Sequence, residues 1–250
     1  MASSNSILFY DLTRNAEGPA RGAHSYNTLR TRLALNIKGI AYETVWITIA
    51  DVESEAIKAG AQPTTERAGK PLYTVPFIVD PSTGRVVSDS PKIAVYLDEQ
   101  YPDTPALGPS GSEAEKRTLE RAERVFGSLR AVCLSRMWDT LPLRTQAYFH
   151  KLFGEEKVVQ MITFVPEALP GSIDAALQAL AEIEGEMGAN SFLGGEKPCW
   201  ADTFLTGVLW SLRIVLGNED GTWKALVEAR SGRWGAYMQE FEQRGWLKVL

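Results

Sequence analysis

Residues 72–102 read LYTVPFIVDPSTGRVVSDSPKIAVYLDEQYP, and this stretch decides the fold of the first hundred residues. The segment LYTVPFIVD, residues 72–80, is predicted to be a strand entered through Pro76. A turn from Pro81 to Gly84 and a short strand from Arg85 to Ser88 follow it. Proline and glycine at these turn positions predict a β-hairpin. A helix follows, with Ser90 as its N-cap.

Upstream of the hairpin, the periodicity of apolar residues predicts two strand–helix pairs. The first helix is closed by Gly39. These elements are the strand 7–12, the helix 27–39, the strand 42–49 and the helix 51–61. The order βαβαββα, with a proline opening the third strand, is the layout of the thioredoxin-like fold.

A proline-rich segment, YPDTPALGPSGS at residues 101–112, interrupts the helical pattern and predicts a stiff linker. We therefore expect an N-terminal domain over residues 1–104 and a second domain over residues 105–250. The second domain has helical patterns throughout and is predicted to be an all-α bundle. Its expected helices are 113–138, 144–153, 172–187, 202–216 and 223–242.

Composition excludes several functional classes. The formal charge of −5 argues against a nucleic-acid-binding or acidic-membrane surface, so neither partner is expected. Two cysteines and two histidines make a disulfide framework, a zinc ribbon and a His-rich metal site improbable, and no metal is expected. We identify no signal peptide and no membrane span, so we expect the protein in the cytoplasm.

The predicted first domain contains no cysteine, since the first in the chain is Cys133. Disulfide exchange by a protein thiolate at the first helix is thus excluded, because the attacking group would have to be a cysteine. Thiol chemistry here requires a thiol that a ligand brings.

Two segments carry a family resemblance. YTVPFIVDPSTGRVVSDSPKIAVYLDEQYPD, at residues 73–103, resembles the glutathione-binding half of cytosolic glutathione transferases. HSYNTLRTRLALNIKGIAYETVW, at residues 24–46, resembles a narrower group, the fungal-specific class A transferases related to bacterial β-etherases. The shared Ser-x-Asn-Thr-type motif is Ser25, Asn27 and Thr28, followed by Leu29 and Arg30.

This resemblance implies a glutathione site. Val75–Pro76 would be a cis peptide whose Val75 N–H and C=O pair with the cysteinyl part of glutathione. Asp89 and Ser90 would bind the γ-glutamyl ammonium and carboxylate at a helix N-terminus, which attracts anions. The charged side chain of Lys70 either binds the glycyl carboxylate of glutathione or lies in solvent.

For thiol activation, Ser25 matches the serine of the family motif and is assigned the hydrogen bond to the glutathione thiolate. The alternative is that Ser25 only caps the helix. Asn27 is the second candidate, because an amide also donates to a thiolate. Tyr10 is a third, although it lies within a strand and away from the helix start.

We expect the electrophile pocket to lie between the domains. Tyr26 and Leu29 replace residues common in the family and are expected to alter the pocket wall. Phe126, Arg130 and Trp138 lie on the helix that would flank the pocket. His24, next to Ser25, either tunes the site or is a solvated loop residue, and we favour the solvated loop position.

PCWADTFL, at residues 198–205, occupies the position of the family's Ser/Thr-x-x-Asp capping box. Cys199 stands in place of the hydroxyl residue, and Asp202 is retained. We expect both residues to be structural, with Cys199 acting as a weak cap.

Two functional hypotheses remain. In the first, the protein is a glutathione transferase that attacks small hydrophobic or aromatic electrophiles in detoxification, by conjugation, thiolysis, peroxide reduction or ether cleavage. In the second, it is a low-turnover carrier of aromatic or phenolic compounds. The resemblance also implies a homodimer.

Overall fold

Four strands form one mixed sheet in the order β2-β1-β5-β6. They are β1 (Ile7–Leu12), β2 (Tyr42–Ile47), β5 (Phe77–Asp80) and β6 (Arg85–Ser88). β1 and β2 are parallel, whereas β5 runs antiparallel to both β1 and β6. This computed structural model describes residues 6–13, 23–67 and 69–248.

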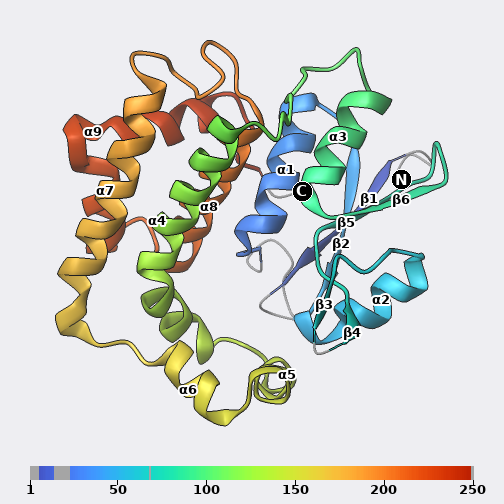
Figure 1. Cartoon of the computed structure of the whole chain (residues 1–250), viewed down its shortest axis with the longest axis horizontal. Coiled ribbons are helices and arrows are strands. Elements are labelled where there is room, and N and C mark those ends of the chain that lie inside the picture. The colour runs from blue at the N-terminus through green and yellow to red at the C-terminus, as the bar shows by residue number, and fades with distance from the viewer. Residues whose placement is uncertain (1–5, 14–22, 68, 249–250) are drawn as a thin grey trace.

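Helices cover both faces of the sheet (Figure 1). Ile7 and Phe9 are buried in one core cluster with residues of α1 (Tyr26–Lys38) and α3 (Ser90–Gln100). Leu12 and Phe77 belong to a second cluster with residues of α2 (Val52–Ala59), which follows the short helix η2 (Ile49–Asp51). Side chains alternate between the faces of a strand, so β1 supplies both cores. The predicted thioredoxin-like arrangement is confirmed.

A second, two-stranded sheet was not predicted. β3 (Thr65–Arg67) and β4 (Lys70–Leu72) pair antiparallel. The strand predicted from Leu72 through Pro76 begins only at Phe77, as β5, and Leu72 instead ends β4. The residues of β3 are all exposed, so they carry no alternation between apolar and polar positions that would signal a strand.

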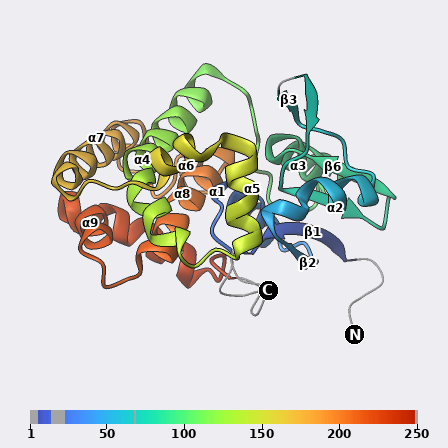
Figure 2. The same cartoon turned by 90° about the horizontal axis from the view of Figure 1, so that it is seen from below.

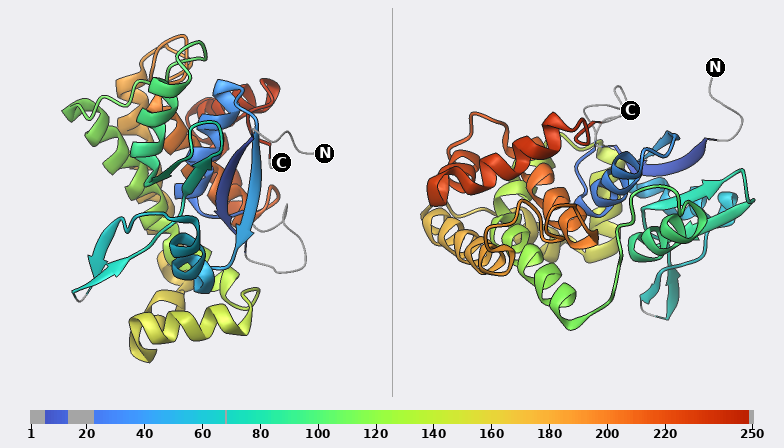
Figure 3. Two further views of the ribbon diagram at one scale, coloured as in Figure 1. Left: turned by 90° about the vertical axis from the view of Figure 1, so that its right-hand side faces the viewer. Right: turned by 90° about the horizontal axis from the view of Figure 1, so that it is seen from above.

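The second domain is helical, as predicted. α3 ends at Gln100 and α4 begins at Glu113, and the chain between them crosses from one domain to the other (Figure 3). The helices are α4 (Glu113–Trp138), α5 (Leu143–Phe153), α6 (Glu155–Ile162), η3 (Pro166–Ala168), α7 (Leu169–Met187), α8 (Trp200–Leu216) and α9 (Gly221–Gln243). α6 was not predicted, and non-helical residues 229–232 interrupt α9. Within the described ranges, no helix is long and apolar enough to cross a membrane.

α8 is the central helix of this domain and also packs against α1 of the first domain. Every residue from Trp200 to Leu212 is buried, which is typical of a helix surrounded by others. At Gly207 the two helices approach so closely that an added Cβ would lie 3.0 Å from the backbone oxygen of Tyr26. The start of α1 is therefore held by α8.

α5 stands between the helical domain and the sheet domain (Figure 2). Arg144 of α5 forms a 2.6 Å ion pair with Asp51 of η2. The guanidinium of Arg67, on β3, lies 4.5 Å from the ring centroid of Phe153. These contacts connect the domains on the side away from α3.

Candidate functional site

Strand register brings the predicted site residues to one edge of the sheet. Phe77, the first residue of β5, pairs with Tyr10 near the carboxyl end of β1 and with Ser88 at the carboxyl end of β6. Because α1 connects the parallel strands β1 and β2, it begins at this same edge. Ser25, Val75–Pro76 and Asp89–Ser90 thus belong to one edge, which we call the sheet-edge site.

Ser25 is half-buried and is the N-cap residue of α1. Its backbone oxygen accepts hydrogen bonds from the N–H groups of Thr28 (3.1 Å) and Leu29 (2.9 Å). Its side chain, in contrast, makes no capping hydrogen bond. Ser25 therefore starts the helix through its backbone, and its hydroxyl is not used for capping.

The two other candidates for thiol activation have different surroundings. Asn27 is the second residue of α1 and hydrogen-bonds to the hydroxyl of Tyr26. Tyr10 stacks on Phe77 with ring centroids 4.1 Å apart, on the sheet face covered by α2. Burial there raises the pKa of Tyr10.

The Val75–Pro76 peptide is cis. The oxygen of Pro76 accepts a hydrogen bond from the N–H of Asp89 at 3.4 Å, which joins the two loops of the sheet-edge site. Within the ranges that the structure describes, no backbone group bonds to the N–H or C=O of Val75.

The N-cap of α3 is Asp89 rather than Ser90, which corrects the sequence prediction. Asp89 has φ +79° and ψ 123°, and its oxygen accepts the first helical hydrogen bond from Ile93 N–H at 2.9 Å. Ser90 is the first helical residue and is 2% exposed. Pro91 comes second in the helix, where its missing N–H has no intrahelical partner to lose.

Lys70 is exposed on β4. Together with Arg67 of β3 it lines a surface groove opposite Tyr148 and Lys151 of α5. This groove lies beside the contacts that join the two domains.

Arg30 is a half-buried cation near the start of α1, and the sequence identified it only as part of the motif. Its guanidinium lies 4.8 Å from the ring centroid of Phe204 and 5.3 Å from that of Trp200. Burial lowers the pKa of Arg30 to about 10, and the charge of Asp89 opposes this shift. Its Nε has no hydrogen-bond partner in the described part of the chain.

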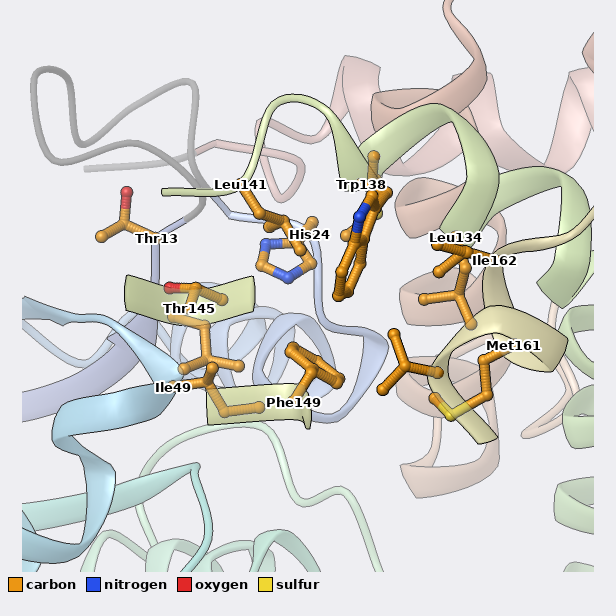
Figure 4. Close-up of a pocket in the computed structure, with 13 residues that line it drawn as sticks. Thr13, His24, Ile49, Leu134, Trp138, Leu141, Thr145, Phe149, Met161 and Ile162 are labelled. Atoms are coloured by element: carbon orange, nitrogen blue, oxygen red, sulfur yellow. The ribbon is translucent and has the colours of Figure 1, made fainter. Parts of the chain in front are cut away.

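An apolar pocket lies between the two domains, and we call it the interdomain pocket (Figure 4). The first domain contributes the end of β1, the residue before Ser25 and η2, and the second contributes the end of α4, the following loop, α5 and α6. The lining residues are Leu12, Thr13, His24, Ile49, Leu134, Met137, Trp138, Leu141, Thr145, Phe149, Val158, Met161 and Ile162.

The helix expected to flank the pocket, α4, does so through Leu134, Met137 and Trp138. Of the other two residues named on this helix, Phe126 packs against Tyr26 at 4.8 Å between ring centroids and Arg130 is exposed. Neither Tyr26 nor Leu29 is a lining residue, and Leu29 is fully buried in the core. His24, for which a solvated loop position was favoured over a role in tuning the site, is partly exposed and lines the pocket (Figure 4).

Comparisons with known proteins agree with this architecture. The sequence profile of the glutathione S-transferase N-terminal domain matches residues 24–100, and that of the C-terminal domain matches residues 120–244. The chain belongs to the glutathione S-transferase family. It is an enzyme family, and the predicted resemblance is confirmed.

Individual relatives extend over almost the entire length of the chain. Glutathione transferase GSTFuA3 from Phanerochaete chrysosporium is 32% identical, with 99% of this chain and 100% of that chain covered and a TM-score of 0.84. A glutathione S-transferase of Ceriporiopsis subvermispora, solved in complex with glutathione, is 31% identical, with 95% and 98% covered and a TM-score of 0.82. The glutathione S-transferase-like protein ustS of Aspergillus flavus is 26% identical, with 96% and 92% covered.

In this glutathione S-transferase family member, Cys199 is the N-cap of α8. The Asp202 carboxylate accepts from Cys199 N–H at 2.8 Å and from Leu193 N–H at 2.9 Å. The Cys199 side chain accepts in turn from the Asp202 N–H, which completes a capping box. Burial raises the pKa of Cys199 to about 12, so this thiol is neutral at physiological pH.

In residues 6–13, 23–67 and 69–248, no three His, Cys, Asp or Glu side chains are grouped so that they could hold a metal ion. The lining residues on α5 and α6, which the sequence did not identify, are apolar except for Thr145. Only the apolar periodicity of their helices could have identified them.

Proposed function

We propose that this protein binds glutathione at the sheet-edge site, where the hydroxyl of Ser25 activates the glutathione thiol. The thiolate then attacks a small hydrophobic or aromatic electrophile in the interdomain pocket. One observation carries this proposal: Ser25 occupies the N-cap of α1, yet its hydroxyl makes no capping hydrogen bond.

The energetic requirement for activation is modest. A cysteinyl thiol has a pKa of about 8.5, and lowering it by about two units requires about 2.7 kcal/mol of preference for the thiolate. A charge-assisted hydrogen bond contributes about 1.5–3 kcal/mol, and a helix N-terminus adds about 0.3–1 kcal/mol. One hydroxyl at the start of α1 is sufficient.

The other residues of the proposed site bind rather than activate. The N–H and C=O of Val75, beside Pro76, pair with the cysteinyl part of glutathione. Asp89 binds the γ-glutamyl ammonium, and the N–H of Ser90 at the start of α3 binds the γ-glutamyl carboxylate. Lys70 is assigned to the glycyl carboxylate.

The decisive experiment titrates the thiolate absorbance of glutathione bound to the parent protein and to Ser25→Ala. We expect the pKa of the bound thiol to lie one to two units below that of free glutathione, as one charge-assisted hydrogen bond of about 1.5–3 kcal/mol predicts. In the variant most of this difference is lost, while binding measured by calorimetry persists. Ser128→Ala, on the outer part of α4, is the matched control.

Other outcomes assign the function differently. Binding without a shift in the parent protein contradicts thiol activation and favours the carrier of aromatic compounds. A shift that survives Ser25→Ala transfers the role to Asn27, Tyr10 or a backbone N–H. A role in detoxification, a homodimer and a cytoplasmic location remain part of the proposal, and sedimentation analysis tests the dimer.

A further inference from the structure

The interdomain pocket is covered by two short helices, α5 and α6. Thr145 and Phe149 of α5 are four residues apart in the chain and therefore share one face of their helix. Val158, Met161 and Ile162 of α6 share a face in the same way, and all five residues line the pocket. Figure 4 shows the side chains of Phe149 and Met161 pointing toward the space between the two domains. Each helix thus turns its pocket-lining face away from solvent.

These two helices are less buried than the rest of the helical domain. Within α5 only Thr145 is buried, and within α6 only Val158, whereas α8 is buried continuously from Trp200 to Leu212. The N-cap residues of α5 and α6 are Pro142 and Gly154, which have no polar side chain for capping. A segment with few buried apolar contacts opens at a lower free energy than the core does.

The pair of helices is attached on two different sides. α6 packs against α4 of its own domain, whereas α5 packs against η2 of the sheet domain. Gly154 joins α5 to α6 with φ +83°, a conformation that favours glycine, and the space around it is open. The side at α4 is therefore the hinge, and the side at η2 is the free edge.

An ion pair joins the free edge to the sheet domain. The guanidinium of Arg144, whose side chain is 70% exposed, lies 2.6 Å from the carboxylate of Asp51. The hydroxyl of Thr48 donates to the same carboxylate and holds it in place. A second contact places the guanidinium of Arg67 over the ring of Phe153 at the other end of α5. Exposed ion pairs contribute little to stability, so the contact at Asp51 breaks and forms again readily.

We propose that α5 and α6 form a lid over the interdomain pocket, latched by the Arg144–Asp51 ion pair, which opens to admit an apolar ligand and closes over it. This inference rests on the proposed function only for the identity of that ligand, the electrophile. Neither residue of the latch lines the pocket, so the latch closes the empty and the occupied pocket alike. It therefore controls the rates of entry and release rather than the affinity.

The test measures the exchange of N-phenyl-1-naphthylamine, a neutral aromatic probe that fluoresces in apolar surroundings, by stopped flow. In Arg144→Gln we expect the association and dissociation rate constants both to rise about twofold to fivefold, as loss of an exposed ion pair predicts. The Kd should change by less than about twofold, because both rate constants rise together. Arg144→Lys, which keeps the charge, should remain near the parent. Leu134→Trp, which fills the pocket from α4, should weaken binding of the probe, and unchanged binding overturns the proposal.

Asp51→Asn removes the other half of the latch. Its rate constants should rise by the same factor, and Arg144→Gln combined with Asp51→Asn should exchange no faster than either variant alone, because the two residues form one interaction. Arg124→Gln is the matched control, since it breaks an exposed ion pair with Glu182 that joins α4 to α7, and it should leave both rate constants unchanged. Faster dissociation with unchanged association, and so a weaker Kd, would indicate a lost ligand contact and overturns the proposal.

A cross-link tests the closed lid directly. Arg144→Cys and Asp51→Cys are combined in a Cys199→Ser background and joined by a short bismaleimide. We expect exchange of the probe to stop, whereas the same linker between Arg124→Cys and Glu182→Cys should leave it unchanged. Exchange that continues at the parent rate with the lid linked overturns the proposal. Both tests omit glutathione, so a failure of thiol activation refutes the proposed function separately and leaves the lid to be judged on these rates.

Discussion

Cys199 is an unusual N-cap residue for α8, and replacing it measures how much the cap contributes to stability. The half-buried, neutral thiol of Cys199 is a weaker hydrogen-bond acceptor than a hydroxyl, and serine is a preferred N-cap residue. We expect Cys199→Ser to raise the free energy of unfolding by up to about 1 kcal/mol, or about 2–4 °C in Tm for a chain of this size. Thermal unfolding measures this difference.

Cys199→Ala provides the comparison for this residue, because it removes the acceptor altogether. Its Tm should fall below that of the parent protein, since the N–H of Asp202 at the start of the buried α8 then loses its partner. A Cys199→Ser variant that is less stable than the parent would show that the sulfur is retained for packing and not for capping.

Asp80 connects the turn after β5 to α3 through its carboxylate. Its carboxylate accepts from the hydroxyls of Tyr96 and Tyr101 at 2.6 Å each, and from the backbone N–H of Ser82 at 2.9 Å. Burial alone would raise the pKa of Asp80, but the hydrogen bonds from Ser82, Tyr101 and Tyr96 lower it below its ordinary value. The ionised carboxylate therefore stabilises the folded state.

Because the pKa of Asp80 is lowered in the folded state, the loss of stability in Asp80→Asn depends on pH. The contribution of the carboxylate is present above its unfolded-state pKa of about 4 and is lost as the pH falls through the lower folded-state pKa. At neutral pH we expect the variant to be about 1–3 kcal/mol less stable than the parent protein, with the difference shrinking below about pH 4. Urea unfolding at both pH values tests this, with the exposed Asp103→Asn as control.

The elements that the sequence predicted correctly are those with a clear period or turn signal. β1, α1 and the β5–β6 hairpin follow from alternation, helical spacing and the Pro81–Gly84 turn. The β3–β4 sheet and α6 were missed because they are short, and β3 lies entirely at the surface. Apolar spacing thus identifies elements that face the core better than elements that face solvent.

The candidate site residues show a similar difference between those that lie in one local motif and those that come from distant segments. Ser25, Pro76 and Asp89 were identified because the motif that carries them is local in sequence, and their roles stay predictions. A pocket between the domains was expected from the resemblance, but most of its lining could not be predicted, since it comes from segments between residues 12 and 162 that only the tertiary fold brings together. The solvated position was favoured for His24 for the same reason, because residues of α4 and α5 that are distant in sequence line the pocket with it.

The contact between α1 and α8 connects the sheet-edge site to the helical domain. A Cβ at Gly207 would meet the backbone oxygen of Tyr26 at 3.0 Å and the backbone nitrogen of Arg30 at 3.2 Å. These are backbone atoms, so they cannot rotate away as a side chain can. A larger residue at position 207 must displace the start of α1.

We therefore expect Gly207→Val to alter both stability and glutathione binding. Overpacking costs about 1–3 kcal/mol, so Tm should fall, and displacement of Ser25 should raise KM for glutathione. Gly185→Ala is the control, because Gly185 is exposed on α7 with open space around it, and alanine there should stabilise the helix by about 0.5–1 kcal/mol. If Gly207→Val keeps the Tm and the KM of the parent protein, α8 does not position the start of α1, and the sheet-edge site is built by the first domain alone.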